Sequence, residues 1–299
     1  MIRQLYNCTR QDLETSRQRD RRHRGGHTVG QPNSVNTTRL SEEVSLAGGT
    51  VIIERSGHGR PVMLVHGEDG SLFLDPFIEA LGVQREVHVI NLPGWGVTPG
   101  SNDVEGVDDL ALLVNDYASS LFDSPTPVVG LSLGAWVTAE AAVFRQGLFS
   151  EVVLVSPIGI KTTPRDERSY VDLWATDPEE LRLLLYGDAS RMADLTALDD
   201  DAFLRLAYAS EAVARHGWAP YLHDPKLPRR LARITSPTLI VTGTHDRFVL
   251  EPSFGERWSQ LIKGTCEHVA LEGVGHRAEE EAPDELARVI QRFLDSPPS

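Results

Sequence analysis

Short apolar runs alternate along the chain with longer stretches in which apolar residues recur at helical spacing. The runs at 61–67 (PVMLVHG), 126–131 (TPVVGL) and 151–157 (EVVLVSP) are almost continuously apolar, which is typical of strands buried on both faces of a sheet. The stretch 104–122 has the period of an amphipathic helix. Strands that alternate with helices predict a mostly parallel, twisted sheet with helices on both faces.

The alternation continues on both sides of these segments. The stretches 42–46 and 50–57 flank an Ala-Gly-Gly turn, which predicts a β-hairpin. Pro283 falls in the first turn of a closing helix, where proline is favoured. The other expected strands are 85–92, 236–243 and 266–273, and the other expected helices are 71–82, one from near Gly134, 253–263 and 282–294.

The pattern of strands stops over 157–232, where only helical spacing remains. The segments 177–187 and 199–217 are predicted to be helices, with Asp177 and Asp199 as their N-caps. An insertion of this kind, placed between two strands of a sheet, is most simply a helical lid. The predicted organisation is therefore an N-terminal extension over 1–40, a core made of 41–156 and 233–299, and a lid over 157–232.

Charge is distributed unevenly along the chain. The net charge is −14, but residues 1–40 carry eight arginines against Asp12, Glu14 and Asp20, so this segment is near +5 and the remainder near −19. An acidic body makes nucleic acid an unsuitable partner. The basic segment has few apolar residues and is expected to be disordered. It is either a basic arm for an anionic surface or an extension without a function.

Composition also limits the compartment and the cofactors. No segment approaches the roughly 20 apolar residues of a membrane-spanning helix, and no apolar signal core begins the chain. Cys8 and Cys266 give neither a disulfide framework nor zinc-ligand spacing. These features predict a cytoplasmic protein. Because the sequence shows no cluster of metal ligands and no dinucleotide-binding glycine motif, we also expect no metal and no cofactor.

The segment 130–134 (GLSLG) holds a serine between two glycines, after a predicted strand and before a predicted helix. A serine at such a turn is exposed on a strained backbone, and glycines remove the side chains that would block it. The pentapeptide alone is a weak signal, since Gly and Ser are common at strand ends. The strand-turn-helix context favours Ser132 as a nucleophile.

A serine hydroxyl needs a base and an orienting acid. His276 follows the last predicted strand, and Asp246 follows the strand before it. Alone, each is more simply explained as a loop or turn residue. Together with Ser132 they stand in the chain order serine, aspartate, histidine, at the ends of successive strands, which predicts a catalytic triad.

An oxyanion-binding site is predicted from two backbone N–H groups. One belongs to Leu133, at the start of the helix after Ser132, and the other to Glu68, in the loop after His66-Gly67, with Asp69 as the alternative. A carboxylate that faced the oxyanion would oppose its formation. The side chains of Glu68 and Asp69 are therefore expected to point away, or one of them to contact a polar part of the substrate.

These motifs resemble the α/β-hydrolase superfamily, and within it the lidded group that includes epoxide hydrolases, haloalkane dehalogenases, C–C bond hydrolases and many esterases. The resemblance covers about residues 45–296 and rests on LVHGEDG, NLPGWGVT, GLSLGA, GTHD and GVGH, together with the stretch leading from the lid into the strand at 236–243. It implies an α/β-hydrolase fold with a helical lid, a triad of Ser132, His276 and Asp246, and a pocket between sheet and lid.

Departures from the subgroup patterns narrow the function. Ser132 argues against dehalogenases and epoxide hydrolases, which use an aspartate nucleophile. C–C hydrolases usually have asparagine before the serine and tryptophan after the histidine, where this chain has Leu131 and Arg277. We therefore predict a serine hydrolase of a small-molecule ester, lactone or thioester. The alternatives are a C–C hydrolase of vinylogous diketones, and an acyltransferase, cyclase or ligand sensor on the same fold.

Aromatic residues gather in the predicted lid. Most are expected to pack within it, while Trp95, Trp174 and Trp218 are predicted to line an apolar substrate pocket. The expected partner is a small-molecule substrate. Neither nucleic acid nor a membrane is expected, and a homodimer is left open.

Arg277 directly follows the predicted base. It is expected at the surface, paired with Glu279 or Glu280, in preference to binding a substrate carboxylate.

Overall fold

The computed structural model describes residues 39–46, 49–164, 166–251 and 253–296. All but the last two residues of the predicted N-terminal extension, 1–40, lie outside these ranges. Residues 37–299 group as one compact unit.

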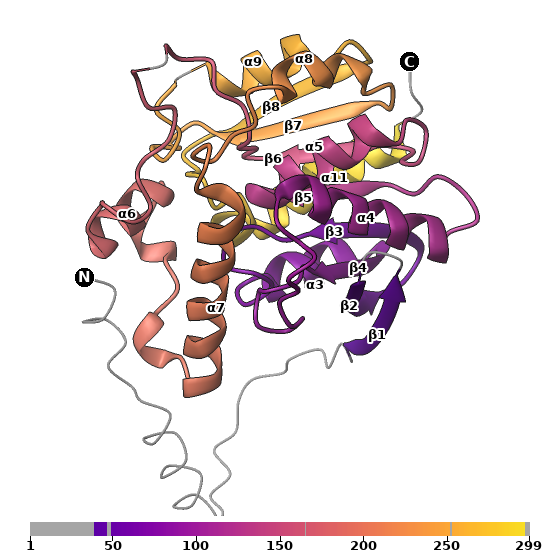
Figure 1. The fold of residues 1–299 in the computed structure, drawn as a ribbon, viewed down its shortest axis with the longest axis horizontal. Helices are drawn as coiled ribbons and strands as arrows, with labels where there is room; N and C mark the ends of the chain where they lie inside the picture. The colour runs from indigo at the N-terminus through magenta and orange to yellow at the C-terminus, as the bar shows by residue number, and fades with distance from the viewer. Residues whose placement is uncertain (1–38, 47–48, 165, 252, 297–299) are drawn as a thin grey trace, which may run out of the picture. The chain divides into compact units, whose positions relative to one another are not determined.

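An eight-stranded sheet organises this unit (Figure 1). Its order is β1-β2-β4-β3-β5-β6-β7-β8, with antiparallel pairs β1–β2 and β2–β4 and parallel pairs elsewhere. The predicted hairpin and the mostly parallel sheet are confirmed. The strands are β1 (Leu40–Leu46), β2 (Gly49–Gly57), β3 (Arg60–Val65), β4 (Arg85–Asn91), β5 (Val128–Leu131), β6 (Val152–Val155), β7 (Thr238–Gly243) and β8 (Cys266–Leu271).

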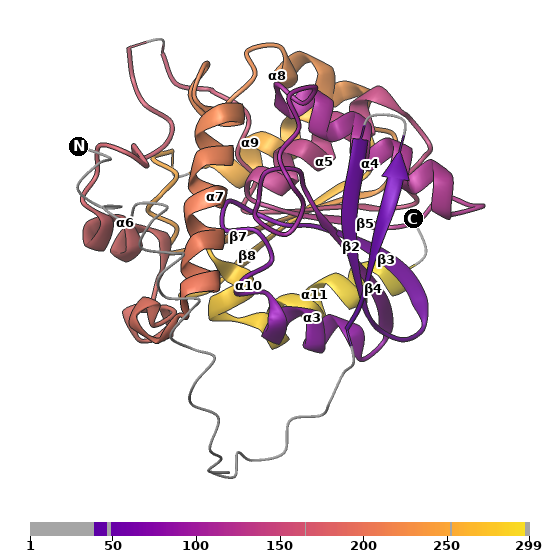
Figure 2. The same ribbon diagram turned by 60° about the horizontal axis from the view of Figure 1, so that its bottom comes forward.

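Helices cover both faces of the sheet, with α4, α5 and α9 on one side and α3 and α11 on the other (Figures 1 and 2). The predicted helix over 71–82 begins only at Asp75, because residues 71–74 form turns and proline at 76 fits a first helical turn. The helices outside the insertion are α3 (Asp75–Gly82), α4 (Val107–Leu121), α5 (Leu133–Phe144), α9 (Phe254–Leu261), α10 (Ala278–Glu281) and α11 (Pro283–Asp295).

The central strands are buried on both faces, as their continuous apolar runs predict. Along β6, Val152 and Leu154 pack in the core under α4 and α5, while Val153 and Val155 pack in the core under α3 and α11. Because both faces are covered, the accessible edge for chemistry is the one formed by the carboxyl ends of the parallel strands.

The insertion between β6 and β7 is helical. Asp177 caps α6 by accepting from the N–H groups of Glu179 and Glu180, and Asp199 caps α7 by accepting from Ala202, so both predicted caps are confirmed. Both views place α6 and α7 at one end of the sheet (Figures 1 and 2). The helices of the insertion are α6 (Pro178–Leu185), η2 (Ala189–Arg191), η3 (Leu195–Ala197), α7 (Asp200–Gly217), α8 (Leu227–Arg230) and η4 (Leu231–Arg233).

No helix within the described ranges combines the length and the apolar character needed to cross a bilayer.

Candidate active site

Ser132 occupies the turn that joins β5 to α5. Its backbone has φ 46° and ψ −107°, a conformation that residues other than glycine rarely adopt. A Cβ at Gly130 would lie 2.5 Å from the Gly134 carbonyl oxygen, and one at Gly134 would lie 2.3 Å from the carbonyl oxygens of Val65 and His66. Gly130 is therefore required for the end of β5 to pack against α5, and Gly134 for the start of α5 to pack against the end of β3.

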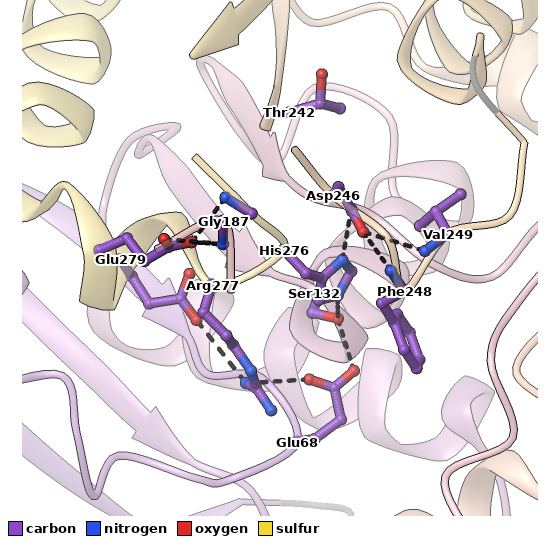
Figure 3. A network of polar contacts seen from close by, with 12 residues as sticks. Glu68, Ser132, Gly187, Thr242, Asp246, Phe248, Val249, His276, Arg277 and Glu279 are labelled. Carbon is purple, nitrogen blue, oxygen red and sulfur yellow. Dashed lines mark hydrogen bonds and ion pairs between the residues drawn. The ribbon is translucent and has the colours of Figure 1, made fainter. Parts of the chain in front are cut away.

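The structure brings Ser132, His276 and Asp246 together (Figure 3). Ser132 Oγ lies 2.7 Å from His276 Nε2, and His276 Nδ1 lies 2.7 Å from Asp246 Oδ2. The other Asp246 oxygen, Oδ1, accepts from the backbone N–H groups of Phe248 at 2.9 Å and Val249 at 3.1 Å, which fixes the carboxylate. This is the hydrogen-bond chain through which a serine hydroxyl can be activated.

His276 is almost completely buried, at 1% exposure. Burial by itself lowers the pKa of the ring, but the Asp246 carboxylate and, after it, Glu68 raise it, and the net result is a pKa above the usual 6.5. Arg277 opposes this rise. Asp246 also fixes the ring tautomer, since its carboxylate accepts the Nδ1 proton.

The carboxyl group of Glu68 points toward Ser132, which corrects the expectation that it points away. Ser132 Oγ donates to Glu68 Oε1 at 2.6 Å, and the Glu68 residue is only 6% exposed (Figure 3). The sequence contains a signal for this arrangement: an acidic pair after His66-Gly67 and an arginine after the catalytic histidine. Both loops follow strands that end at the same edge of the sheet.

Arg277 is buried, at 4% exposure, so the expectation of a surface residue is wrong. Its guanidinium lies 2.8 Å from Asp69, 3.3 Å from Glu68 Oε2 and 3.8 Å from Glu279. The predicted pair with Glu279 is therefore present, but Asp69 and Glu68 lie closer. The guanidinium compensates the buried carboxylates of Glu68 and Glu279 and the partly buried carboxylate of Asp69 beside Ser132.

Two hydrogen bonds hold the loop after β3 in place. His66 Nε2 accepts from the backbone N–H of Leu92 at 3.0 Å, and burial lowers the pKa of His66 to about 4, so that the ring is neutral. The Glu68 carbonyl oxygen accepts from the Trp95 indole N–H at 2.9 Å. These bonds tie the loop to the loop that follows β4.

One predicted oxyanion donor belongs to the residue that follows Ser132, and the other to a residue whose side chain contacts Ser132. Leu133 is the first residue of α5, so its N–H has no acceptor within the helix. Glu68 belongs to the loop that contacts Ser132. Their role as a pair of backbone donors stays a prediction.

Of the three predicted pocket residues, Trp95 forms a hydrogen bond to a residue of this site, Glu68. It is buried beside Glu68 and stacks on His216 of α7, with ring centroids 5.7 Å apart and planes at 12°. Trp174 and Trp218 meet edge to face at 5.1 Å, and Trp218 is 58% exposed. Trp218 lines an open groove whose lining residues include no triad member. A role of these tryptophans in substrate binding stays a prediction.

No group of three or more His, Cys, Asp or Glu side chains arranged to hold a metal ion occurs in the described part of the chain.

A model of the Alpha/beta hydrolase family matches residues 62–289. The chain is 21% identical to a pimeloyl-[acyl-carrier protein] methyl ester esterase of Xylella fastidiosa, over 82% of this chain and 99% of the relative. It is 24% identical to a 2-hydroxy-6-oxononadienedioate/2-hydroxy-6-oxononatrienedioate hydrolase of Klebsiella pneumoniae, over 88% of this chain and 98% of the relative.

Solved structures share the fold. A serine hydrolase involved in carbazole degradation superposes with a TM-score of 0.70 at 21% identity, covering 86% of this chain and 99% of that one. The naproxen esterase of Bacillus subtilis superposes with a TM-score of 0.68 at 18% identity, covering 87% and 92%.

Proposed function

Because the chain belongs to the alpha/beta hydrolase family, we propose that it is a serine hydrolase that cleaves a small-molecule ester, lactone or thioester. The observation that carries this proposal is the hydrogen-bond chain from Ser132 through His276 to Asp246, built on a strained turn. Similarity to an esterase along most of both chains supports the ester bond as the target.

The mechanism follows from the positions of these groups. Ser132 Oγ attacks the carbonyl carbon while its proton passes to His276 Nε2, and Asp246 stabilises the imidazolium that forms. The N–H groups of Leu133 and Glu68 hold the negative oxygen of the tetrahedral intermediate. The imidazolium then protonates the leaving group, and a water molecule activated by His276 hydrolyses the acyl-enzyme.

A C–C bond hydrolase is the second candidate, because a relative with that type of name matches 88% of this chain. The site geometry favours hydrolysis of an ester-type bond over hydrolysis of a C–C bond. The name of that relative's substrate denotes two carboxylates, whereas the nucleophile here faces the carboxylate of Glu68. The nearby Arg277 is already engaged by Glu68 and Asp69, so it offers no free cation for a dianionic substrate.

The test is a panel of p-nitrophenyl esters of different acyl length beside a ring-cleavage diketone, assayed with the wild type and Ser132→Ala. We expect ester turnover by the wild type, and a loss of about six orders of magnitude in S132A because the triad acts as a unit. Labelling of Ser132 by a fluorophosphonate distinguishes a hydrolase from an inert ligand sensor. An S132A protein that keeps most of its turnover would contradict the proposal.

The chain offers a matched control in Ser156, which follows the neighbouring strand β6. It is also buried and strained, with φ 43°, and its hydroxyl has no hydrogen-bond partner in the described part of the chain. Ser156→Ala should therefore leave ester turnover within a few-fold of the wild type. A similar loss in both variants would point to misfolding instead of a missing nucleophile.

We also infer a cytoplasmic location and a small-molecule partner. The support is compositional, since two cysteines far apart in the sequence suit a reducing compartment.

A further inference from the structure

Ser132 Oγ lies between two hydrogen-bond acceptors. Glu68 Oε1 is 2.6 Å away and His276 Nε2 is 2.7 Å away. A hydroxyl has one proton, which it can donate along only one of these two lines. The second contact needs a proton from elsewhere, since two facing lone pairs at such distances repel.

The neutral imidazole does not supply this proton. Its single N–H is the Nδ1 proton, which the Asp246 carboxylate accepts at 2.7 Å. Nε2 of the neutral ring therefore carries a lone pair. The observed arrangement of Glu68, Ser132 and His276 requires one proton more than the active form of a serine triad contains.

The charges around His276 indicate where this extra proton is held. Asp246, Glu68 and Glu279 present carboxylates to the ring region, and Arg277 presents a guanidinium. Glu68 Oε2 lies 3.3 Å from that guanidinium, as a carboxylate would. The second proton therefore belongs on Nε2, consistent with the raised pKa of His276.

We propose that Glu68 is a further residue of the catalytic site: in the resting enzyme its carboxylate accepts a hydrogen bond from the Ser132 hydroxyl and so holds His276 in its protonated form. This inference rests on the proposed function, since it assigns Glu68 control over the pH at which the same nucleophile becomes active. The resting chain is imidazolium Nε2–H to Ser132 Oγ, and Ser132 O–H to the Glu68 carboxylate.

Turnover then begins with a defined proton step. The Nε2 proton leaves to solvent, which leaves a lone pair on Nε2. The Ser132 hydroxyl then rotates so that it donates its hydrogen bond to Nε2 instead of to Glu68. One proton has been released, and the triad is in the form that can attack a carbonyl. Glu68 thus raises the pH at which the nucleophile becomes active, beyond what Asp246 alone would do.

The variant Glu68→Gln tests this directly. The amide can donate an N–H to Ser132 Oγ, so the hydroxyl can donate to a neutral His276, and the extra proton is no longer needed. The rate constant of inactivation by a fluorophosphonate reports Ser132 reactivity without knowledge of the substrate. We would measure it from about pH 5 to about pH 9, around the histidine range.

We expect the acid limb of this profile to move down by about one pH unit or more in E68Q, the usual effect of removing a nearby opposite charge. Asp69→Asn is the matched control, because Asp69 pairs with the same guanidinium at 2.8 Å but makes no hydrogen bond to Ser132. Its limb should move by less than half as much. The proposal would be overturned if the inactivation rate constants of the wild type and E68Q rose at the same pH, or if E68Q and D69N shifted that pH equally.

An NMR titration of the His276 ring in the wild-type protein gives an independent answer, with the signal assigned by comparison with His276→Asn. We expect the ring to remain protonated above pH 6.5, the ordinary value for histidine. A ring already neutral at that pH would contradict the inference even if E68Q failed to fold. If the wild type is never labelled at Ser132, the proposed function fails, while a comparison of the His276 titration in the wild type and in E68Q still tests the role of Glu68.

Discussion

Ser132 occupies a strained backbone conformation that exposes its hydroxyl but costs stability. A non-glycine residue at φ 46° costs on the order of 1–3 kcal/mol, and the surrounding contacts must supply that energy. The Ser132 N–H donates to the Val155 carbonyl at 2.8 Å, and its own carbonyl accepts from Ala135 and Trp136. The turn is therefore held by β6 on one side and by the first turn of α5 on the other.

The close packing of this turn makes Gly134 sensitive to substitution. In Gly134→Ala the new methyl group would lie 2.3 Å from two backbone oxygens of β3 and its loop, which cannot move as a flexible side chain can. We expect a loss of at least about 2 kcal/mol in the free energy of unfolding, together with lost Ser132 reactivity. Denaturant unfolding and fluorophosphonate labelling measure the two effects.

Gly100→Ala is the control for this substitution, because a Cβ there meets only the Gly94 Cα at 3.7 Å. It should unfold within about 0.5 kcal/mol of the wild type. If G134A were as stable and as reactive as G100A, the packing explanation of the two glycines would be wrong.

The positions of single residues could be predicted wherever a motif fixes the backbone. Ser132, Asp246 and His276 follow the ends of β5, β7 and β8, so their order along the chain determines where they meet. The direction of a side chain on a loop is different. One oxygen of Glu68 faces Ser132 and the other faces a buried guanidinium from a loop more than 200 residues later. The acidic pair and the arginine are visible in the sequence, but they do not fix the direction of either side chain.

At the scale of elements, one carboxylate connects the insertion between β6 and β7 to the loop that carries His276. Glu281 of α10 accepts from the N–H groups of Gly187 at 2.9 Å, Asp188 at 2.8 Å and Gly275 at 2.6 Å. The His276 N–H donates in turn to the carbonyl of Leu185, at the end of α6. The position of the base therefore depends on the insertion.

Glu281→Gln should loosen this connection. The amide offers one acceptor oxygen in place of two and turns an NH₂ group toward backbone donors, so part of the cluster loses its partner. We expect the free energy of unfolding to fall by about 1–3 kcal/mol and amide exchange at Gly187, Asp188 and Gly275 to become faster. Hydrogen exchange followed by NMR resolves these amides individually.

The adjacent Glu280 provides the control. Burial raises its pKa to about 8, so near pH 7 the group is mostly neutral, and its carboxyl accepts from the Tyr186 hydroxyl at 2.5 Å. Glu280→Gln resembles this neutral form and should leave exchange at Gly187 unchanged. Equal effects of the two variants would show that Glu281 has no special part in holding the lid.

The elements themselves were largely predictable, because period and chain order are local properties. The buried apolar runs became β3, β5 and β6, and the helical segments of the insertion became α6 and α7. What the period could not give is the network between elements, such as the stacking of Trp95 on His216 or the cluster at Glu281. These contacts join residues far apart in sequence and depend on the finished fold.

At the scale of the whole molecule, acidic groups are buried in a chain that already carries a charge of −14. Glu140 of α5 is 2% exposed, and its nearest cation, Arg230, lies 3.6 Å away and also pairs with Asp224 at 3.0 Å. Burial, with the neighbouring Asp224, raises the pKa of Glu140 to about 7. Folding therefore opposes ionisation of this group.

The sign of the resulting pH dependence is definite. In the unfolded chain Glu140 ionises near its ordinary pKa of 4.5, whereas in the folded protein it ionises only near 7. Between these values the folded state binds more protons, so the contribution of Glu140 to stability falls as the pH rises and is lowest above pH 7. Glu140→Gln removes this effect and should raise the free energy of unfolding above pH 7 by about 1–3 kcal/mol, with little change below pH 4.5.

Thermal melts of both proteins across that range measure it, with Glu211→Gln as an exposed control that should follow the wild type throughout. An E140Q protein less stable than the wild type at every pH would show that the ion pair with Arg230 outweighs the burial of the charge.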